Sequence, residues 1–402
     1  MSNDASMSND ERLTMPHHGK NTLHPETEFT HVGRPAVGLA TAVSPDITRA
    51  STLLFNRAED LYRSDIRGYG RHGSAGHDAL IEAFNLLEGG AGTTLAQSGL
   101  AACTLPILAN VKAGDHLLLT DSSYGPTRHF CQKYLKGMGV ETQMYDPRIG
   151  SGIDSLIREN TSVIMLESPG SLTFEIQDIP AITKAAQAKG VTTIIDNTWS
   201  GGLSLKPLSL GVDISCHAAT KYFGGHSDVM FGATISASAK MAKKVALTAK
   251  YLGYATSPDD AYQILRGFRT VVHRFRQSEE SALSLAKWLE GHDKVHRVLH
   301  PALSSHPDHA IWKRDFTGAA CLFGVVLKPC SETDVLAFIN ALQLFGIGYS
   351  YGGFESLAIH CDPQLTRQHS EDLGGPLVRF ACGLEAASDL KDDIMQAFSV
   401  LP

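Results

Sequence analysis

Apolar residues along this chain gather in two patterns, short continuous runs and longer stretches with helical spacing. The short runs predict buried strands, because a strand covered on both faces needs apolar side chains at nearly every position. They lie at residues 93–97, 116–120, 140–145, 163–167, 191–196 and 212–216. Apolar positions that recur every three or four residues predict amphipathic helices at 78–87, 100–111, 127–136 and 179–189. This alternation predicts an α/β fold with a large, mostly parallel sheet that helices cover on both faces.

The pattern changes after about Gly267. The predicted elements there are a helix at 278–289, a strand at 321–327, a helix at 332–344 and a strand at 377–381. A chain of 402 residues is too long for one simple core. We therefore expect an N-terminal tail and arm over 1–73, a large domain over 74–266 and a smaller α+β domain over 267–402.

The charge balance and the apolar runs exclude several classes of partner. The formal net charge of −7 gives no electrostatic reason to expect nucleic acid or an anionic membrane. No apolar run reaches the roughly 18 residues of a membrane span, and no secretory segment opens the chain. The first residues, Met1–Lys20, are polar and repeat Met-Ser-Asn-Asp at positions 1 and 7, which we interpret as a disordered tail.

The cysteines and histidines indicate neither a disulfide framework nor a metal site. The seven cysteines are scattered and include no C-x-x-C pair, so a reducing cytoplasm is the simplest location. The 18 histidines form no H-E-x-x-H or other ligand spacing. We therefore expect no metal cofactor.

Lys221 is the residue with the clearest chemical context. It follows the apolar run at 212–216 and lies between Thr220 and the glycine-rich turn Gly224-Gly225. A lysine there can bind a carbonyl cofactor such as pyridoxal phosphate covalently, provided that its amine is partly deprotonated. The alternative is an ordinary surface lysine at a strand end.

Asp196 ends the apolar run at 191–196. Active-site side chains of open α/β sheets gather at the carboxyl ends of such strands. The Asp196 carboxylate could keep the ring nitrogen of pyridoxal phosphate protonated, which makes the ring a better electron sink. Its position, 25 residues before Lys221 (221 − 196), suits two neighbouring strands. The alternative is a helix cap or turn aspartate.

Ser98-Gly99-Leu100 lies where a predicted strand passes into a helix. Free backbone N–H groups and the positive helix end could hold a phosphate there, and Gly99 allows close approach. Such a sequence is also common in simple turns. Arg379 is a charge in the apolar run at 377–381, where a substrate carboxylate or a structural ion pair could be its partner.

Several motifs in one order resemble the Cys/Met-metabolism family of pyridoxal-phosphate enzymes, and within it the bacterial cystathionine β-lyases. The resemblance runs from about residue 35 to the C-terminus. Its motifs are Tyr69-Gly70-Arg71, Gln97-Ser98-Gly99-Leu100, Asp121-Ser122-Ser123-Tyr124, Asp196-Asn197-Thr198-Trp199, the segment around Lys221, Tyr349-Ser350-Tyr351-Gly352-Gly353 and Val378-Arg379-Phe380. Any one of them alone would be a weak signal.

The resemblance implies a fold-type I, transferase-like architecture and a role for each motif. Lys221 would carry the cofactor and move the substrate proton, and the ring of Tyr124 would stack on the pyridine. The phosphate would bind Gly99 and Leu100 with Ser98 and Thr220, and Tyr69 and Arg71 would reach it from the neighbouring subunit. Arg379 and Ser350 would bind the substrate carboxylate, and Tyr349 and Tyr351 would line the substrate pocket. The expected assembly is a homotetramer of two active-site-sharing dimers.

The sequence departs from the family pattern at two positions. Ala218 stands where many relatives have a serine that contacts the phosphate, so one hydroxyl contact is missing or is supplied elsewhere, for example by Ser98. Tyr351 stands where the most similar β-lyases are expected to have tryptophan. Tyr349 occupies a position that is often glutamate in family members acting at Cγ.

The resemblance implies β-elimination of L-cystathionine to homocysteine, pyruvate and ammonia. Two alternatives remain open. One is a family enzyme that acts at Cγ, namely a cystathionine γ-lyase, methionine γ-lyase or cystathionine γ-synthase. The other is a catalytically silent regulatory protein that binds pyridoxal phosphate, against which the joint presence of Lys221, Asp196, Tyr124 and Arg379 argues.

Overall fold

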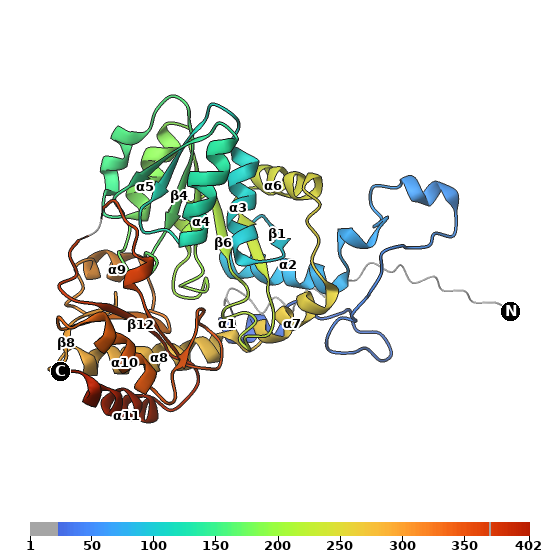
Figure 1. Ribbon diagram of the computed structural model, residues 1–402. Helices are drawn as coiled ribbons and strands as arrows, with labels where there is room; N and C mark the ends of the chain where they lie inside the picture. The colour runs from blue at the N-terminus through green and yellow to red at the C-terminus, as the bar shows by residue number, and fades with distance from the viewer. Residues whose placement is uncertain (1–22, 370) are drawn as a thin grey trace.

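The computed structural model describes residues 23–369 and 371–402, and the tail expected at Met1–Lys20 lies outside them. Figure 1 shows a larger sheet with its helices, a smaller sheet with its helices and an extended N-terminal arm. All seven cysteines are free thiols, and all except Cys330 are buried. No helix among the described residues is both long enough and apolar enough to cross a membrane.

Seven strands form the larger sheet in the spatial order β1-β7-β6-β5-β4-β2-β3. Their bounds are β1 (Gly92–Ala96), β2 (His116–Thr120), β3 (Glu141–Tyr145), β4 (Thr161–Glu167), β5 (Thr192–Asp196), β6 (Ile214–His217) and β7 (Gly232–Ser236). The strands from β6 to β3 pair in parallel, whereas β7 runs antiparallel to both β1 and β6. The sheet is therefore mixed but mostly parallel, which confirms the predicted fold class.

Alternate side chains of these strands enter two separate apolar clusters. The helices that accompany the sheet are α2 (Ala75–Glu88), α3 (Gly99–Asn110), α4 (Gly125–His129), α5 (Ile179–Ala188), α6 (Ala239–Tyr251) and α7 (Pro258–Phe268). Leu118 joins Phe84 of α2 in one cluster, whereas Leu117 and Leu119 join Ile107 of α3 in the other. Burial on both faces explains why the strands appear in the sequence as continuous apolar runs.

The C-terminal part has five strands in the order β10-β11-β12-β9-β8. Its strands are β8 (Val295–Leu299), β9 (Leu322–Leu327), β10 (Gly346–Ile347), β11 (Leu357–His360) and β12 (Leu377–Ala381). Its helices are α8 (Val271–Leu289), α9 (His309–Asp315), α10 (Glu332–Ala341) and α11 (Ala387–Ala397). β12 is the central strand and pairs antiparallel with both β9 and β11.

Some predicted elements differ from the structure. The helix expected at 127–136 is present, but it is not α-helical throughout, because α4 ends at His129 and Phe130–Leu135 continue it as a π-helical segment. β7, α6 and α7 are additional elements, and β7 has the short, small-residue sequence Gly-Ala-Thr-Ile-Ser, which carries little apolar signal. The domain boundaries after residues 73 and 266 stay predictions.

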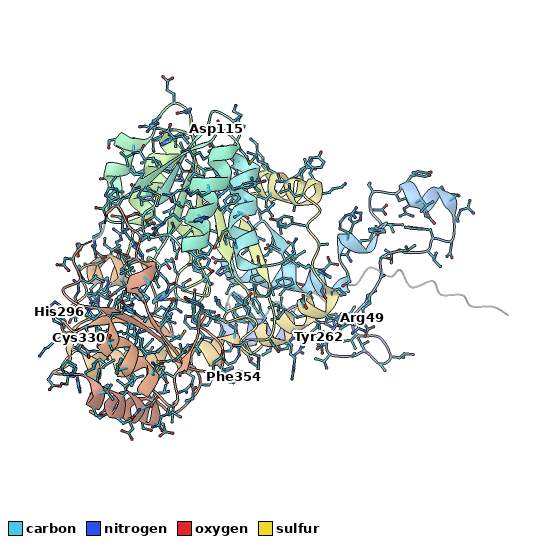
Figure 2. The ribbon with its side chains drawn as sticks, in the orientation of Figure 1. Arg49, Asp115, Tyr262, His296, Cys330 and Phe354 are labelled. Carbon is cyan, nitrogen blue, oxygen red and sulfur yellow. The ribbon has the colours of Figure 1, made fainter. Side chains whose placement is uncertain are left out.

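The arm after α1 (Pro25–His31) leaves the body of the molecule. Figure 1 shows this segment in blue, extending away from α2 and α7 before it returns. Its apolar side chains are strongly exposed, with Leu54 at 95% and Tyr62 at 88%. Arg49, labelled in Figure 2, pairs with Asp259 of α7 at 2.5 Å. The base of the arm is thus tied to α7, while its far end makes few contacts that cover its apolar residues.

Candidate active site

The ends of neighbouring strands bring the predicted chemistry together. Tyr124 follows β2, Asp196 ends β5 and Lys221 follows β6, and these strands lie in the order β6-β5-β4-β2. Asp196 is in register with Cys216 of β6. The two strands are neighbours as expected, although their connection holds a 3-10 turn at Pro207–Leu210 rather than a regular helix. The carboxyl ends of parallel strands meet at one edge, so these groups share that edge.

Lys221 lies in a turn that the chain forms directly after β6. Backbone hydrogen bonds run from Gly224 to Ala219 and from Gly225 to Lys221, both at 2.8 Å. Gly225 has φ +71°, and a Cβ there would meet the guanidinium of Arg274. The position therefore requires glycine, which fixes the direction in which the turn carries Lys221.

The amine of Lys221 points toward the C-terminal part of the chain. Its Nζ donates to Ser350 Oγ at 2.6 Å. Burial, and next the positive charge of Arg379, lower the pKa of Lys221 to about 8. A lysine with this pKa is partly uncharged near neutral pH, as a nucleophilic amine must be.

Asp196 is held by donors from two elements. Its Oδ1 accepts from the N–H (3.0 Å) and the hydroxyl (2.6 Å) of Thr198, and its Oδ2 accepts from the thiol of Cys103 on α3 at 3.4 Å. The same Thr198 hydroxyl accepts from the N–H of Ala218 at 2.9 Å. These bonds orient the carboxylate and connect it to the turn that carries Lys221.

The start of α3 lies where the phosphate cup was expected, and its binding of a phosphate stays a prediction. Ser98 caps the helix, since its Oγ accepts from the N–H of Ala101 at 3.1 Å. The first N–H groups of a helix have no intrahelical partner, so those of Gly99 and Leu100 remain available for an anion. A Cβ on Gly99 would lie 2.3 Å from the Cβ of Ala218, so glycine is needed where the two turns meet.

Thr220 already has partners within the chain. Its hydroxyl accepts from the N–H of Phe231 at 2.8 Å and lies 3.2 Å from the carbonyl oxygen of that residue. These bonds fix the turn before Lys221. The contact between Thr220 and a phosphate stays a prediction.

Arg379 of β12 approaches Lys221 from the smaller sheet. Its Nη2 donates to the carbonyl oxygen of Ser350 at 3.1 Å, and its Nε is buried with no partner among the described residues. A guanidinium nitrogen in that situation favours an anionic ligand. Ser350 has φ +109°, a strained value for a residue with a side chain. The Tyr351 ring lies 5.0 Å from Lys221 Nζ and forms a wall beside it.

Tyr124 begins α4 at the same edge of the sheet. Its N–H donates to Oε2 of Glu167, the last residue of β4, at 2.6 Å. Its side chain is 46% exposed, so the ring is free to stack on a ligand. The stacking itself stays a prediction.

A loop between β11 and β12, residues 366–369, packs on the turn that carries Tyr124. Asp121 Oδ2 accepts two backbone N–H groups of this loop at 2.8 and 2.7 Å. Arg128 donates to the carbonyl oxygen and hydroxyl of Thr366 and to the carbonyl oxygen of Asp121. The loop thereby joins the strand that carries Arg379 to the turn before Tyr124.

Two predicted site residues, Tyr69 and Arg71, are not brought to Lys221 within this chain. The guanidinium carbon of Arg71 lies 5.1 Å from the ring centre of Tyr69, and both residues belong to the arm. In the described part of the chain, neither has a hydrogen bond or ion pair with the residues around Lys221. Tyr349 is 75% exposed. Their roles in binding cofactor and substrate stay predictions.

The structure also shows residues that the sequence patterns did not single out. Thr198 and Cys103 hold Asp196, and Glu167 holds the Tyr124 turn. Glu167 ends a predicted strand just as Asp196 does, and this strand-end position is the signal that could have identified it. Cys103 had no such signal, because a buried thiol in a helix looks like an ordinary apolar residue.

Cavity size does not locate this site. The described cavities of about 540 and 250 Å³ lie along β3 and beside Arg148, and Lys221 lines neither of them. No group of three or more His, Cys, Asp or Glu residues with the arrangement of a metal site occurs among the described residues. The groups at the strand ends fit pyridoxal phosphate instead. Lys221 offers an amine and Asp196 a carboxylate. The turn at Gly99 leaves room for a phosphate because glycine has no Cβ.

Comparisons with known proteins agree with this fit. A family profile described as Cys/Met metabolism PLP-dependent enzyme matches residues 26–399. Proteins named cystathionine beta-lyase from Salmonella typhimurium and from Escherichia coli are 41% and 40% identical, each over 93% of this chain and 98% of its own length. A cystathionine gamma synthase structure from Xanthomonas oryzae pv. oryzae, in complex with cystathionine, has a TM-score of 0.87 at 30% identity and covers 94% of this chain and 99% of its own.

Proposed function

Because this chain belongs to the Cys/Met-metabolism family of pyridoxal-phosphate-dependent enzymes, we propose that it catalyses β-elimination of L-cystathionine to homocysteine, pyruvate and ammonia. One observation supports this reaction over others in the family: relatives that match nearly the whole chain are named cystathionine beta-lyase. The short contact between Lys221 and Ser350 supports an enzyme rather than a silent relative, because it holds a partly uncharged amine in place.

Pyridoxal phosphate, when bound, supplies the carbonyl group for the substrate amine and the ring that accepts the electron pair freed at the α-carbon. Lys221 takes the α-proton, which its lowered pKa allows near neutral pH. Asp196 would hold the proton on the ring nitrogen, and Arg379 would bind the substrate carboxylate beside Ser350. The Cβ–S bond then breaks, the electron pair leaves with sulfur as homocysteine, and the three-carbon fragment is hydrolysed to pyruvate and ammonia.

The arm supports a second part of the proposal, that two copies of the chain share each site. It carries Tyr69 and Arg71 away from the body, and its apolar side chains at Leu54 and Tyr62 are almost fully exposed. In a dimer the arm would cover these side chains on the neighbour and bring Arg71 to the neighbour's phosphate cup. We further propose that two such dimers form a homotetramer in the cytoplasm, where free thiols are stable.

The products from L,L-cystathionine test the proposed reaction. We expect pyruvate with little 2-oxobutyrate, measured with lactate dehydrogenase and by chromatography of the two keto acids. Dominant 2-oxobutyrate would contradict β-elimination and favour a γ-lyase. The absence of both keto acids from protein loaded with cofactor would favour a silent relative.

Tyr349 offers a variant that sharpens this test. The phenol places bulk and a neutral hydroxyl where a carboxylate would bind the distal amino group of cystathionine. We expect Tyr349→Glu to raise the share of 2-oxobutyrate, because the substrate would then bind with its Cγ–S bond toward the ring. Phe354→Glu, at another exposed aromatic residue of the same loop, is the matched control. An equal shift in both variants would remove Tyr349 from the choice of bond.

A further inference from the structure

Glu167 lies between two proposed site residues but has no part in the proposed reaction. It is in register with Asp196 across β4 and β5, so the two side chains lie on the same face of neighbouring strands, roughly 4.8 Å apart along the sheet. On its other side, its Oε2 accepts from the N–H of Tyr124 at 2.6 Å. One carboxyl group thus contacts the Tyr124 turn and neighbours the aspartate proposed for the ring nitrogen.

Two carboxyl groups this close do not both ionise readily, because like charges disfavour each other. Asp196 receives three donors, the N–H and hydroxyl of Thr198 and the thiol of Cys103. In the described part of the chain, Glu167 receives one, the Tyr124 N–H. Hydrogen bonds to a carboxylate stabilise its charged form, so the negative charge belongs on Asp196 and the proton on Glu167.

The surroundings of Glu167 favour the same assignment. Burial, and next the negative charge of Asp196, raise the pKa of Glu167 well above its ordinary value. The groups that oppose this increase are the Tyr124 N–H and the guanidinium groups of Arg367 and Arg128. Arg367 also interacts with Glu175, and Arg128 is directed to backbone carbonyl groups, so neither is committed to Glu167. The phenols of Tyr351 and Tyr124 are further ionisable groups that feel the charge of this carboxyl.

We propose that Glu167 is a positioning residue that remains protonated, fixes the turn of Tyr124 through its N–H, and leaves Asp196 as the only carboxylate beside the ring nitrogen. In this state the uncharged carboxyl group of Glu167 still accepts the hydrogen bond from the Tyr124 N–H. The charge of Asp196 already favours the protonated amine of Lys221, and an ionised group at position 167 would add a second negative charge beside it, whereas a neutral group does not. This inference rests on the proposed cofactor site but not on the identity of the sulfur substrate.

The test replaces Glu167 by the neutral isostere in Glu167→Gln and removes the acceptor in Glu167→Ala, with exposed Glu159→Gln as the control. The first measurement is the rate at which the full-length apo protein takes up pyridoxal phosphate, followed by visible absorbance across pH without any sulfur substrate. Only the neutral amine of Lys221 reacts, so the parent rate should rise with pH with a midpoint at about 8. This readout is independent of β- or γ-elimination.

A protonated Glu167 predicts that Glu167→Gln keeps this midpoint to within about 0.2 pH units and keeps the parent kcat to within about twofold. A fall of about one unit in the midpoint would show that a negative charge was removed, and would overturn the proposal. A loss of more than about tenfold in kcat at an unchanged midpoint would also overturn it, because the amide retains the acceptor.

Glu167→Ala tests the positioning role. We expect a fall of about tenfold in kcat and a weaker circular dichroism band of the bound cofactor, because the Tyr124 turn loses its acceptor. Parent-like values for both would show that Glu167 does not position Tyr124. If Glu167→Ala fails to fold, Glu167→Asp replaces it, because the shorter side chain also withdraws the acceptor from the Tyr124 N–H. The same changes in kcat and in the circular dichroism band then support or overturn the positioning role.

Discussion

The edge of the large sheet and the N-terminal arm contribute to the proposed site in different ways. At the sheet edge, Lys221 and Asp196 already have partners in the same chain. In the arm, the guanidinium of Arg71 lies over the ring of Tyr69, and the apolar residues Leu54 and Tyr62 are exposed. This difference is the basis of our proposal that one chain builds the groups for the reaction, whereas a second copy completes phosphate binding.

The largest effect is expected at Lys221. Lys221→Ala removes the amine that binds the cofactor and moves the proton, so kcat should fall by about 10³-fold or more. Lys243→Ala, at an exposed lysine of α6, should retain parent activity. Pyruvate release from cystathionine measures both variants. A Lys221→Ala protein with full turnover would place the chemistry outside the sheet edge.

The next effect is expected at Asp196. Asp196→Asn keeps the size of the side chain but cannot hold the ring nitrogen protonated, so activity should fall by about 10²-fold or more while some cofactor still binds. Asp154→Asn at an exposed aspartate is the control. Activity and bound cofactor are measured on the same sample. Nearly parental turnover would remove Asp196 from the mechanism.

The arm gives a smaller effect and a direct test of sharing. Arg71→Ala loses a charge-assisted contact with phosphate, so the affinity for pyridoxal phosphate should weaken by about tenfold or more. Arg63→Ala, at an arm arginine that pairs with Asp65 of its own chain, should bind like the parent.

Mixed dimers of Arg71→Ala and Lys221→Ala chains should recover activity, because one of their two sites has both residues intact. Refolded mixtures, separated by two affinity tags, measure this recovery. Verified mixed dimers without activity would mean that Arg71 serves the site of its own chain or no site at all.

The smallest effect is expected at Ser350, where the two sheets meet. Ser350→Ala removes the acceptor for Lys221 Nζ but keeps the carbonyl oxygen that binds Arg379. We therefore expect kcat/KM to fall by about two- to tenfold. Steady-state kinetics on cystathionine, with exposed Ser388→Ala as the control, measure this change. A fall as large as that of Lys221→Ala would show that Ser350 has a chemical role of its own.

The sequence predicted the parts of the fold that follow from burial. Strand β2 appears in the sequence as His-Leu-Leu-Leu-Thr and was predicted with its observed bounds. Strand β7 was missed because Gly-Ala-Thr-Ile-Ser has little apolar volume, and its antiparallel direction depends on how the Lys221 turn returns the chain. The change from α- to π-helix after His129 likewise has no signal in the apolar spacing.

The same limit applies to the site. Lys221 and Asp196 could be predicted because each stands next to a clear apolar run. Glu167 ends such a run too, but its meaning depends on the spatial order of β2, β4 and β5, which local patterns do not determine. The role proposed for Arg71 depends on a second chain, which a pattern within one chain does not describe.

The covalent attachment of the cofactor tests the central claim most directly. Borohydride reduces the carbon–nitrogen link between a lysine amine and pyridoxal phosphate and makes it permanent. After reduction, digestion and mass spectrometry of the loaded protein, the account predicts that the added mass lies on the peptide that contains Lys221. A cofactor mass on any other lysine, or none on protein that is yellow before reduction, would contradict it.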